Sequence, residues 1–157
     1  MVMKRADTVV PELGSSGGEA TNQAIAPAGE ARVLDRLPSR VQEALAAFRQ
    51  ALLDAFPAQI RRIILYGSYA RGDATPDSDV DVMIVVAWEE ERLPGGFYRS
   101  MYGDPRWERI VDLAMDITLD FGIYISPILI GRSRFEEWSP LMHSVRREGV
   151  ELWNPKS

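Results

Sequence analysis

The sequence predicts a small α/β protein, more closely an α+β arrangement, in which a mixed β-sheet is flanked by helices. Helical and strand-like hydrophobic patterns alternate along the chain in the order helix, strand, strand, helix, strand, helix. The chain has 157 residues, which suffices for one domain and little more. Hydrophobic residues make up 46% of the sequence and charged residues 26%, as in a globular protein with a core.

The first 30 residues differ in composition from the rest of the chain. Residues 6–30 are rich in Ala, Gly, Ser, Thr and Pro, and residues 14–18 read Gly-Ser-Ser-Gly-Gly. This composition is typical of a flexible linker, because it offers no sustained apolar face to bury. We therefore interpret residues 1–30 as a disordered N-terminal leader and residues 31–157 as the domain.

The first predicted helix covers residues 39–56. Ser39 and Gln42 have the spacing of a capping box, and Pro57 ends the pattern. Apolar residues recur within it at helical spacing, which predicts one buried face: Val41, Leu45, Phe48 and Leu52.

Two strands are predicted next, over residues 60–66 and 80–86, because both segments are short and rich in β-branched residues. A polar, glycine-containing stretch over residues 67–78 separates them. The second strand is apolar on both faces except for Asp81. A long polar connection follows over residues 87–103.

The remaining elements begin at Asp104, which is a helix cap followed by a proline at the first helical position. The helix is predicted to end at Gly122. A third strand follows over residues 123–130, where Pro127 indicates an edge strand or a bulge.

Two further helix starts and one short strand complete the pattern. Ser133 and Glu136 have the spacing of another capping box, and Ser139 with Pro140 starts a last helix that ends before Gly149. Residues 150–153 form the candidate terminal strand.

Composition excludes several functions. The net charge of −5 argues against a protein that binds nucleic acid by neutralising phosphates, so nucleic acid is not an expected partner. With no cysteine and one histidine, thiol chemistry and sites that need two imidazoles are excluded. No apolar run is long enough to span a membrane, and no apolar segment follows the charged N-terminus, so we expect a cytoplasmic protein without a membrane partner.

The segment from Gly67 to Asp81 carries the candidate chemistry. Alternation along a strand places Asp79 and Asp81 on one face, where two carboxylates repel each other unless a cation joins them. Oxygen ligands alone favour Mg²⁺ or Mn²⁺ over zinc. Gly67 and Ser68 follow a buried strand, so backbone amides and a hydroxyl are available there to hold phosphate oxygens.

This segment has three other interpretations. Gly67 and Gly72 have the spacing of a P-loop, but Asp73 replaces its lysine and would repel a phosphate. An EF-hand loop starting at Asp77 fails, because its sixth position is not glycine and its twelfth is not glutamate. The third is structural: the two aspartates cap a turn and solvate a strand edge. A carboxylate inside an apolar strand, as at Asp81, opposes it.

The same residues resemble a known family signature. Gly67-Ser68, ten residues, and then Asp79-Val80-Asp81 look like the motif of the DNA polymerase beta-like nucleotidyltransferase superfamily. The fuller string from Gly67 to Gly72 with Ser78 to Asp81 is similar to its minimal nucleotidyltransferases. The order of elements over residues 39–130 agrees with that fold. The resemblance implies transfer of a nucleoside monophosphate from an NTP, with ATP the expected donor, to an acceptor hydroxyl.

The resemblance also implies roles for individual residues. Asp79 and Asp81 would be the catalytic and metal-binding residues and would hold two Mg²⁺ ions roughly 3.5–4 Å apart. Gly67 and Ser68 would bind the β- and γ-phosphates. Arg71 would either add charge near the leaving group or pin the short helix with a salt bridge. Ser78 would either hydrogen-bond Asp79 or cap the turn.

One departure from the family pattern leaves catalysis open. Members usually supply a third carboxylate from the strand after the central helix, and residues 123–130 contain no acid. Asp116 and Asp120 on the preceding helix either reach the site or face solvent. The alternative function is therefore a weak or inactive module that binds nucleotide or a partner protein.

The acceptor is not identified by any residue. The resemblance and the short chain imply a separate helical partner protein, since small stand-alone members act as antitoxins that adenylylate a toxin. The sequence does not predict the oligomeric state.

Overall fold

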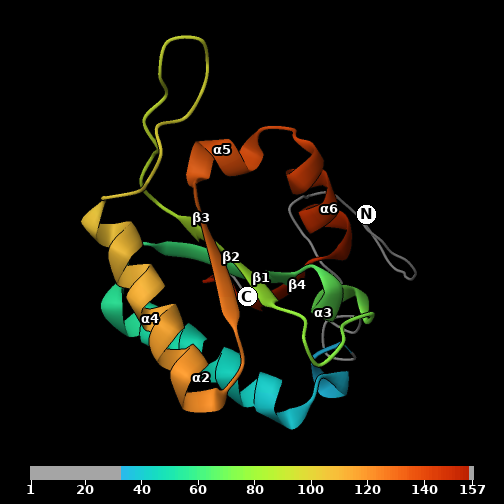
Figure 1. The fold of residues 1–157 in the computed structure, drawn as a ribbon. Helices are drawn as coiled ribbons and strands as arrows, with labels where there is room; N and C mark the ends of the chain where they lie inside the picture. Colours follow the sequence, from blue (N-terminus) through green and yellow to red (C-terminus); the bar gives the residue numbers. More distant parts are fainter. Residues whose placement is uncertain (1–32, 156–157) are drawn as a thin grey trace.

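The structure is a computed structural model that describes residues 33–155, so the leader expected over residues 1–30 lies outside the described residues. Its centre is a four-stranded sheet in the order β3-β2-β1-β4, drawn in Figure 1. The strands are β1 (Ile60–Tyr66), β2 (Val80–Val86), β3 (Ile125–Gly131) and β4 (Val150–Trp153). β1 pairs antiparallel with β2 and β4, whereas β2 and β3 are parallel. The sheet is thus mixed, which confirms the predicted fold class.

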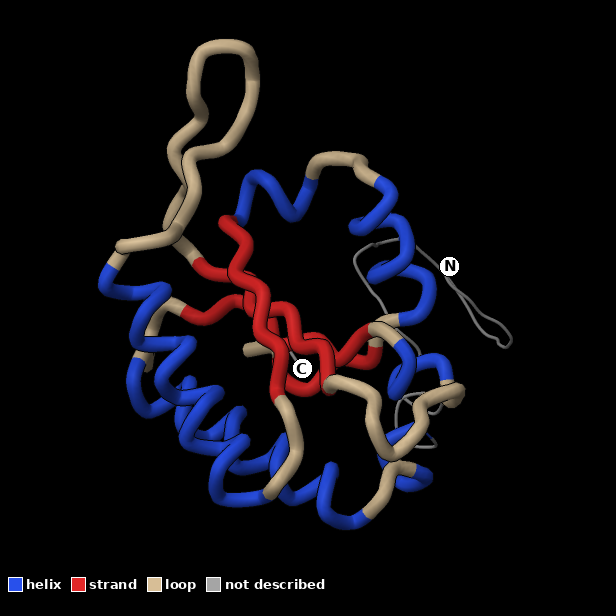
Figure 2. The backbone as a smooth tube through the Cα atoms, viewed as in Figure 1, coloured by secondary structure: helices blue, strands red, loops and turns tan. Residues whose placement is uncertain are grey.

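Two long helices cover the first face of the sheet. They are α2 (Ser39–Ala55) and α4 (Pro105–Phe121), which lie side by side (Figures 1 and 2). Every second residue of β2 faces them, because side chains alternate along a strand. The larger core is buried here, and its fully enclosed members include Phe48, Leu52, Ile63, Ile84 and Ile110.

Two shorter helices cover part of the second face. They are α5 (Arg132–Glu136) and α6 (Pro140–Glu148), on the opposite side of the sheet from α2 and α4 (Figures 1 and 2). The core on this side is smaller and consists of Ile64, Met83, Val85, Ile130, Phe135, Met142 and Val145. Tyr66 and Ile128 are only partly buried at its margin. The start of β2 and the end of β1 on this face therefore extend beyond the hydrophobic cover.

Both predicted capping boxes are wrong. Pro38 is the N-cap of α2, and Ser39 is already its first helical residue. The Gln42 side chain donates instead to the carbonyl of Leu37 at 2.8 Å. α5 follows β3 directly, so Gly131 becomes its N-cap. The chain path into a helix decides which residue is the cap, and residue spacing does not encode that path.

The other two predicted helix starts are confirmed. The Asp104 carboxylate accepts the backbone N–H of Arg106 at 2.8 Å, with proline at the first position of α4. The Ser139 hydroxyl accepts the backbone N–H of Met142 at 3.1 Å at the start of α6. Side-chain oxygens satisfy exposed amides in both first turns.

β3 is the edge strand that Pro127 predicted. The Ile125 N–H donates to the Thr118 hydroxyl at 3.0 Å, and the Gly131 N–H donates to the Glu90 carboxylate at 2.9 Å. Both backbone N–H groups therefore point away from β2. Backbone directions alternate along a strand, so the nitrogen of Pro127, which follows Ile125 by two residues, also points away from β2. The missing N–H of proline removes no hydrogen bond from the sheet.

Within residues 33–155, no helix combines the length and the apolar character needed to cross a membrane.

Candidate active site

Three polar side chains form a row on the second face of the sheet, beyond the hydrophobic cover. Tyr66 on β1 lies opposite Asp81 on β2, and Asp81 lies beside Ser126 on β3. Residues opposite each other in paired strands share a face, so all three side chains emerge on the same side as Met83 and Ile128. The strands thus place a carboxylate between two hydroxyl groups.

Gly67 brings the backbone directly against Asp81. Its φ of +81° and ψ of −156° lie in a region that only glycine occupies readily. A Cβ at this position would overlap Oδ2 of Asp81 and lie 3.2 Å from its Cγ. The end of β1 and the start of α3 (Ser68–Arg71) can therefore reach the carboxylate only because residue 67 has no side chain.

The charge of Asp79 acts on Asp81, which follows it by two residues in the sequence. Burial raises the pKa of the half-buried Asp81 carboxyl, and the negative charge of Asp79 raises it further, while the Arg71 guanidinium opposes both effects. Burial, followed by the charge of Asp81, also raises the pKa of Tyr66. Asp79 itself is exposed and precedes β2 by one residue. Two adjacent carboxylates open to solvent on one side suit a hard divalent cation.

Arg71 is held by two carboxylates at the end of α3. Its guanidinium lies 3.2 Å from Asp73 and 3.5 Å from Glu148 on α6. These contacts agree with the predicted alternative in which a salt bridge pins the short helix. Arg71 nevertheless lowers the pKa of Asp81, so its charge is felt at the candidate site.

Ser78 caps the turn before β2. Its hydroxyl accepts the backbone N–H of Thr75 at 2.8 Å, and its own N–H donates to the Thr75 carbonyl at 2.9 Å. The buried ring of Tyr69 supports the same turn, since its hydroxyl donates to the Thr75 carbonyl at 3.4 Å. This geometry favours the turn-capping alternative for Ser78 and fixes the approach to Asp79.

Neither candidate for a third carboxylate joins the pair. Asp116 and Asp120 are exposed on α4, which covers the first face of the sheet, whereas Asp81 emerges on the second face. The sheet therefore separates them from Asp81. Among the described residues, no group of three or more Asp, Glu or His side chains is arranged to hold a metal ion. The β3 residue that lies beside Asp81 is Ser126, which is not acidic.

Reasoning from the sequence missed Tyr66 and Ser126 as members of this row. Both are ordinary strand residues, and their positions beside Asp81 depend on the register of β1 and β3 against β2. The only local signal is that Ser126 interrupts an otherwise apolar strand.

Comparison with known proteins supplies independent evidence about the family of this chain. The family model described as a nucleotidyltransferase domain matches residues 45–137, which include the whole segment from Gly67 to Asp81. A relative from Methanocaldococcus jannaschii, provisionally named a protein adenylyltransferase, is 31% identical over 115 residues. That alignment covers 71% of this chain and 97% of the relative.

Solved structures with similar chain paths are more distant. A toxin-antitoxin crystal structure with AMP-PNP aligns with a TM-score of 0.47 at 21% identity, covering 71% of this chain and 74% of that chain. A complex of the tri-AMPylated Shewanella oneidensis HEPN toxin with its MNT antitoxin aligns with a TM-score of 0.45 at 20% identity. It covers 73% of each chain.

Proposed function

This chain belongs to the nucleotidyltransferase domain family, and we propose that it transfers AMP from ATP to a hydroxyl group on a protein. The observation that carries the proposal is the half-buried Asp81 beside Asp79, with the backbone of Gly67 pressed against it. A carboxylate with a raised pKa beside a second carboxylate, at an open end of the sheet, is typical of a functional site.

Asp79 and Asp81 are the proposed ligands of Mg²⁺, with Mn²⁺ as a possible substitute. Their donor set fits such an ion, because carboxylate oxygens are its preferred protein ligands and the two charges repel each other without it. When bound, the ion would counter the negative charge of the triphosphate and favour ionisation of the acceptor hydroxyl.

Gly67 and Ser68 are proposed to hold the terminal phosphates. The Gly67 backbone lies against Asp81, and Ser68 is the next residue, so amide and hydroxyl donors are available beside the carboxylates. Arg71 would contribute positive charge from the end of α3, in addition to its ion pairs. Ser78 would act indirectly in nucleotide binding, by fixing the turn that carries Asp79.

The donor and the acceptor class are supported by the Methanocaldococcus jannaschii relative. It is named for adenylyl transfer to protein, and nearly its whole length aligns with this chain. The proposed acceptor is accordingly a separate protein, as in a toxin and antitoxin pair in which the antitoxin adenylylates the toxin.

A second candidate function is a nucleotide-binding module with little or no turnover. The observation that favours it is Ser126, which stands where β3 meets Asp81 and has no charge, while Asp116 and Asp120 lie behind the sheet. Such a module would retain nucleotide binding by Asp79 and Asp81.

Calorimetric titration with a non-hydrolysable ATP analogue, with and without Mg²⁺, tests the proposed site. We expect Mg²⁺-dependent binding that is lost in Asp79→Asn/Asp81→Asn. The matched control is Asp112→Asn/Asp116→Asn, which removes the same charge from exposed positions on α4 and should bind like the unmutated protein. Binding that survives in the site variant, or no binding by the unmutated protein, would overturn the proposal. Binding of nucleotide without turnover would show that the second candidate function, a nucleotide-binding module, is correct.

A further inference from the structure

Residues 87–103, which we call the arm, project from the sheet between β2 and α4 (Figures 1 and 2). The arm has internal order, because Arg92 and Tyr98 form an antiparallel bridge. Backbone hydrogen bonds close its two sides, from the Arg99 N–H to the Glu91 carbonyl at 2.8 Å and from the Leu93 N–H to the Phe97 carbonyl at 2.6 Å. It is therefore a shaped element.

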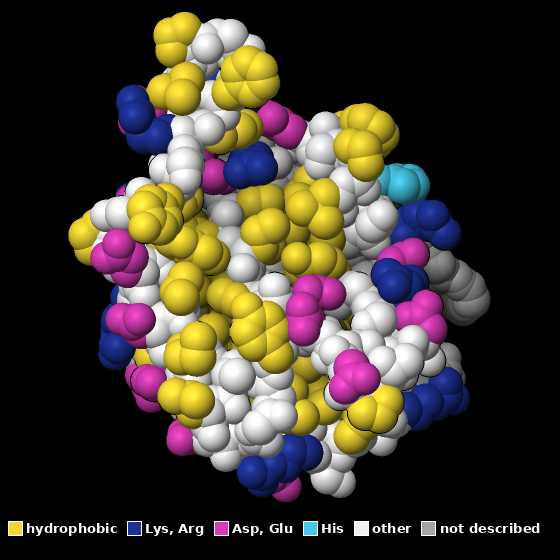
Figure 3. Space-filling model, in the orientation of Figure 1, with side chains coloured by type: hydrophobic (Ala, Val, Ile, Leu, Met, Phe, Trp, Pro, Cys, Tyr) yellow, Lys and Arg dark blue, Asp and Glu magenta, His cyan; other side chains and the backbone are white. Residues whose placement is uncertain are grey.

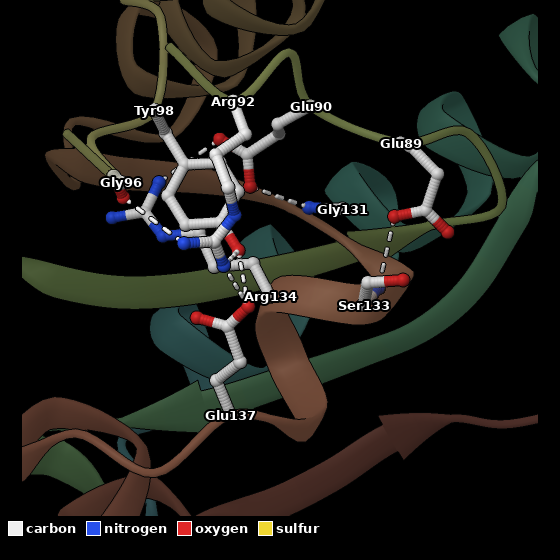
Figure 4. Close-up of polar contacts among 9 residues, drawn as sticks. All are labelled: Glu89, Glu90, Arg92, Gly96, Tyr98, Gly131, Ser133, Arg134 and Glu137. Atoms are coloured by element: carbon white, nitrogen blue, oxygen red, sulfur yellow. Dashed lines mark hydrogen bonds and ion pairs between the residues drawn. The ribbon is translucent and has the colours of Figure 1, made fainter. Parts of the chain in front are cut away.

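A buried carboxylate anchors the arm to the rest of the molecule. The Glu90 side chain, only 1% exposed, accepts the backbone N–H of Gly131 at 2.9 Å and pairs with Arg134 on α5 at 2.9 Å, as Figure 4 shows. The Tyr98 ring lies 4.6 Å from the Arg92 guanidinium and 4.9 Å from that of Arg134. These contacts hold the base of the arm against the end of β3.

A pocket of about 560 Å³ opens between the arm, the start of α4 and β3. Its lining combines apolar and aromatic side chains with polar ones: Phe97, Tyr98, Met101, Tyr102, Trp107 and Ile128 on the one hand, and Glu90, Arg99, Ser100 and Arg134 on the other. Phe97 is 74% exposed and Tyr102 is 90% exposed. Figure 3 shows hydrophobic side chains both on the arm and on the surface between α4 and α6. Exposed apolar side chains that gather on one surface, as Phe97 and Tyr102 do on the arm, are typical of interaction sites.

The charges around the pocket cancel. Four arginines and four glutamates pair one to one: Arg92 with Glu137, Arg99 with Glu91, Arg132 with Glu89, and Arg134 with Glu90. The surroundings therefore do not select a nucleic acid or another anionic ligand. Aromatic residues, methionine and paired arginines are instead the composition of protein–protein contact surfaces, where apolar anchors fill pockets.

The pocket and the candidate active site lie at different positions along β3. Ile128 lines the pocket, and Ser126, two residues earlier on the same face, lies beside Asp81. Two residues of strand span about 6–7 Å. Gly67, on the other side of Asp81, belongs to the end of β1. The proposed phosphate site thus lies on the β1 side of Asp81, and β3, which carries the pocket-lining Ile128, lies on its other side.

In-line transfer requires the acceptor to approach opposite the departing pyrophosphate. If the terminal phosphates lie at Gly67 and Ser68, the acceptor oxygen approaches from the β3 side of Asp81. It then forms a bond to the α-phosphorus as the bond to the bridging oxygen breaks. Pyrophosphate leaves and the hydroxyl proton passes to water.

We propose that the pocket beneath the arm docks a protein acceptor, which inserts an apolar or aromatic side chain next to its reactive hydroxyl. This inference rests on the proposed function, because it assigns the acceptor of that same transfer. Phe97 and Tyr102 pack against the inserted side chain. The paired charges around the pocket leave no net charge, so uncharged residues can flank the reactive hydroxyl of the acceptor.

An array of synthetic peptides tests the inference with α-³²P-labelled ATP and Mg²⁺. Each peptide carries one Ser, Thr or Tyr, flanked by Phe or Leu, by Ala, by Glu or by Lys. We expect at least tenfold more label on peptides with Phe or Leu flanks. Phe97→Ser/Tyr102→Ser should remove that preference without changing affinity for the ATP analogue. Leu119→Ser is the matched control, because Leu119 is also 74% exposed but lies on α4 outside the pocket.

Each other outcome overturns the docking assignment. These outcomes are equal labelling of all flanks, a preference for charged flanks, an arm variant that labels like the unmutated protein, and no labelled peptide despite analogue binding. A second copy of this chain as occupant would appear as a dimer in sedimentation that Phe97→Ser/Tyr102→Ser disperses. Loss of analogue binding by the unmutated protein would instead show that the proposed function fails.

Discussion

Substitution of Gly67 by alanine tests whether the backbone at the end of β1 must touch Asp81. The added Cβ would overlap Oδ2 of Asp81 and come within 3.2 Å of Cγ and 3.3 Å of Cβ, whereas side-chain Cβ atoms stay beyond 3.0 Å of other atoms. The φ of +81° adds backbone strain of about 1–3 kcal/mol for any L residue. The clash can be relieved only by turning the carboxylate away, because its oxygen is the nearest atom.

Gly72→Ala is the matched control. Gly72 also has a positive φ, +87°, but a Cβ there meets nothing within 4 Å. Both variants should lose about 1–2 kcal/mol or more in urea unfolding, through the left-handed backbone alone. Only Gly67→Ala should also lose function, because a misplaced catalytic group can cost about 100-fold in rate.

The assays are urea unfolding, calorimetry with the ATP analogue and Mg²⁺, and labelling of the peptide array. In an Asp81→Ala background, Gly67→Ala should cost less stability than in the native background, since the clashing oxygens are gone. Equal analogue affinity in Gly67→Ala and Gly72→Ala would refute the argument that the approach of Gly67 to Asp81 shapes the site.

Four further predictions concern charge and capping. Because the folded pKa of Asp81 is raised above its ordinary value of 3.8, Mg²⁺-dependent nucleotide binding should decline with falling pH before an ordinary aspartate protonates; a midpoint at or below 3.8 contradicts this. The same raised pKa means that the free energy of unfolding falls as pH rises from the unfolded-state pKa of Asp81 to its folded-state pKa. Asp81→Asn should therefore be more stable than the unmutated protein near neutral pH in urea unfolding. Glu90→Ala should cost about 1–3 kcal/mol in urea unfolding, because the Gly131 N–H loses its buried acceptor. The control Glu91→Ala should cost less, because its ion pair with Arg99 is exposed. Asp104→Ala should cost about 1 kcal/mol through loss of the α4 cap, and an unchanged thermal midpoint would count against that role.

The sequence predicted the helices and strands well, because their signals are local. Apolar spacing located α2 and α4 to within a residue, and runs of β-branched residues located β1 and β2. The third strand starts at Ile125, two residues later than predicted, because the chain first turns through Gly122 in the left-handed conformation. The capping boxes of Ser39 and Ser133 failed, since the path of the chain before each helix supplied a different cap.

The candidate site was predictable only where its residues are close in sequence. Asp79, Asp81, Gly67 and Ser68 share one motif, so their spacing was informative. Ser126 meets Asp81 through parallel pairing across a helical crossover, which a single sequence does not encode.

The same limit applies to the arm. Glu90 is separated from Gly131 and Arg134 by more than 40 positions, so its buried contacts depend on tertiary packing. The sequence of residues 87–103 indicated only a polar connection. Most of its charged residues have partners that are distant in the sequence, so their pairing could not be predicted.

The most direct test of nucleotidyl transfer is to compare ATP labelled with ³²P at the α- and γ-positions, using the peptide array and Mg²⁺. The account predicts that α-label becomes covalently attached to peptide while γ-label is recovered as pyrophosphate, and that Asp79→Asn/Asp81→Asn abolishes both. Transfer of γ-label to peptide would show phosphoryl transfer instead, and absence of both products despite analogue binding would show that the chain binds nucleotide without transferring it.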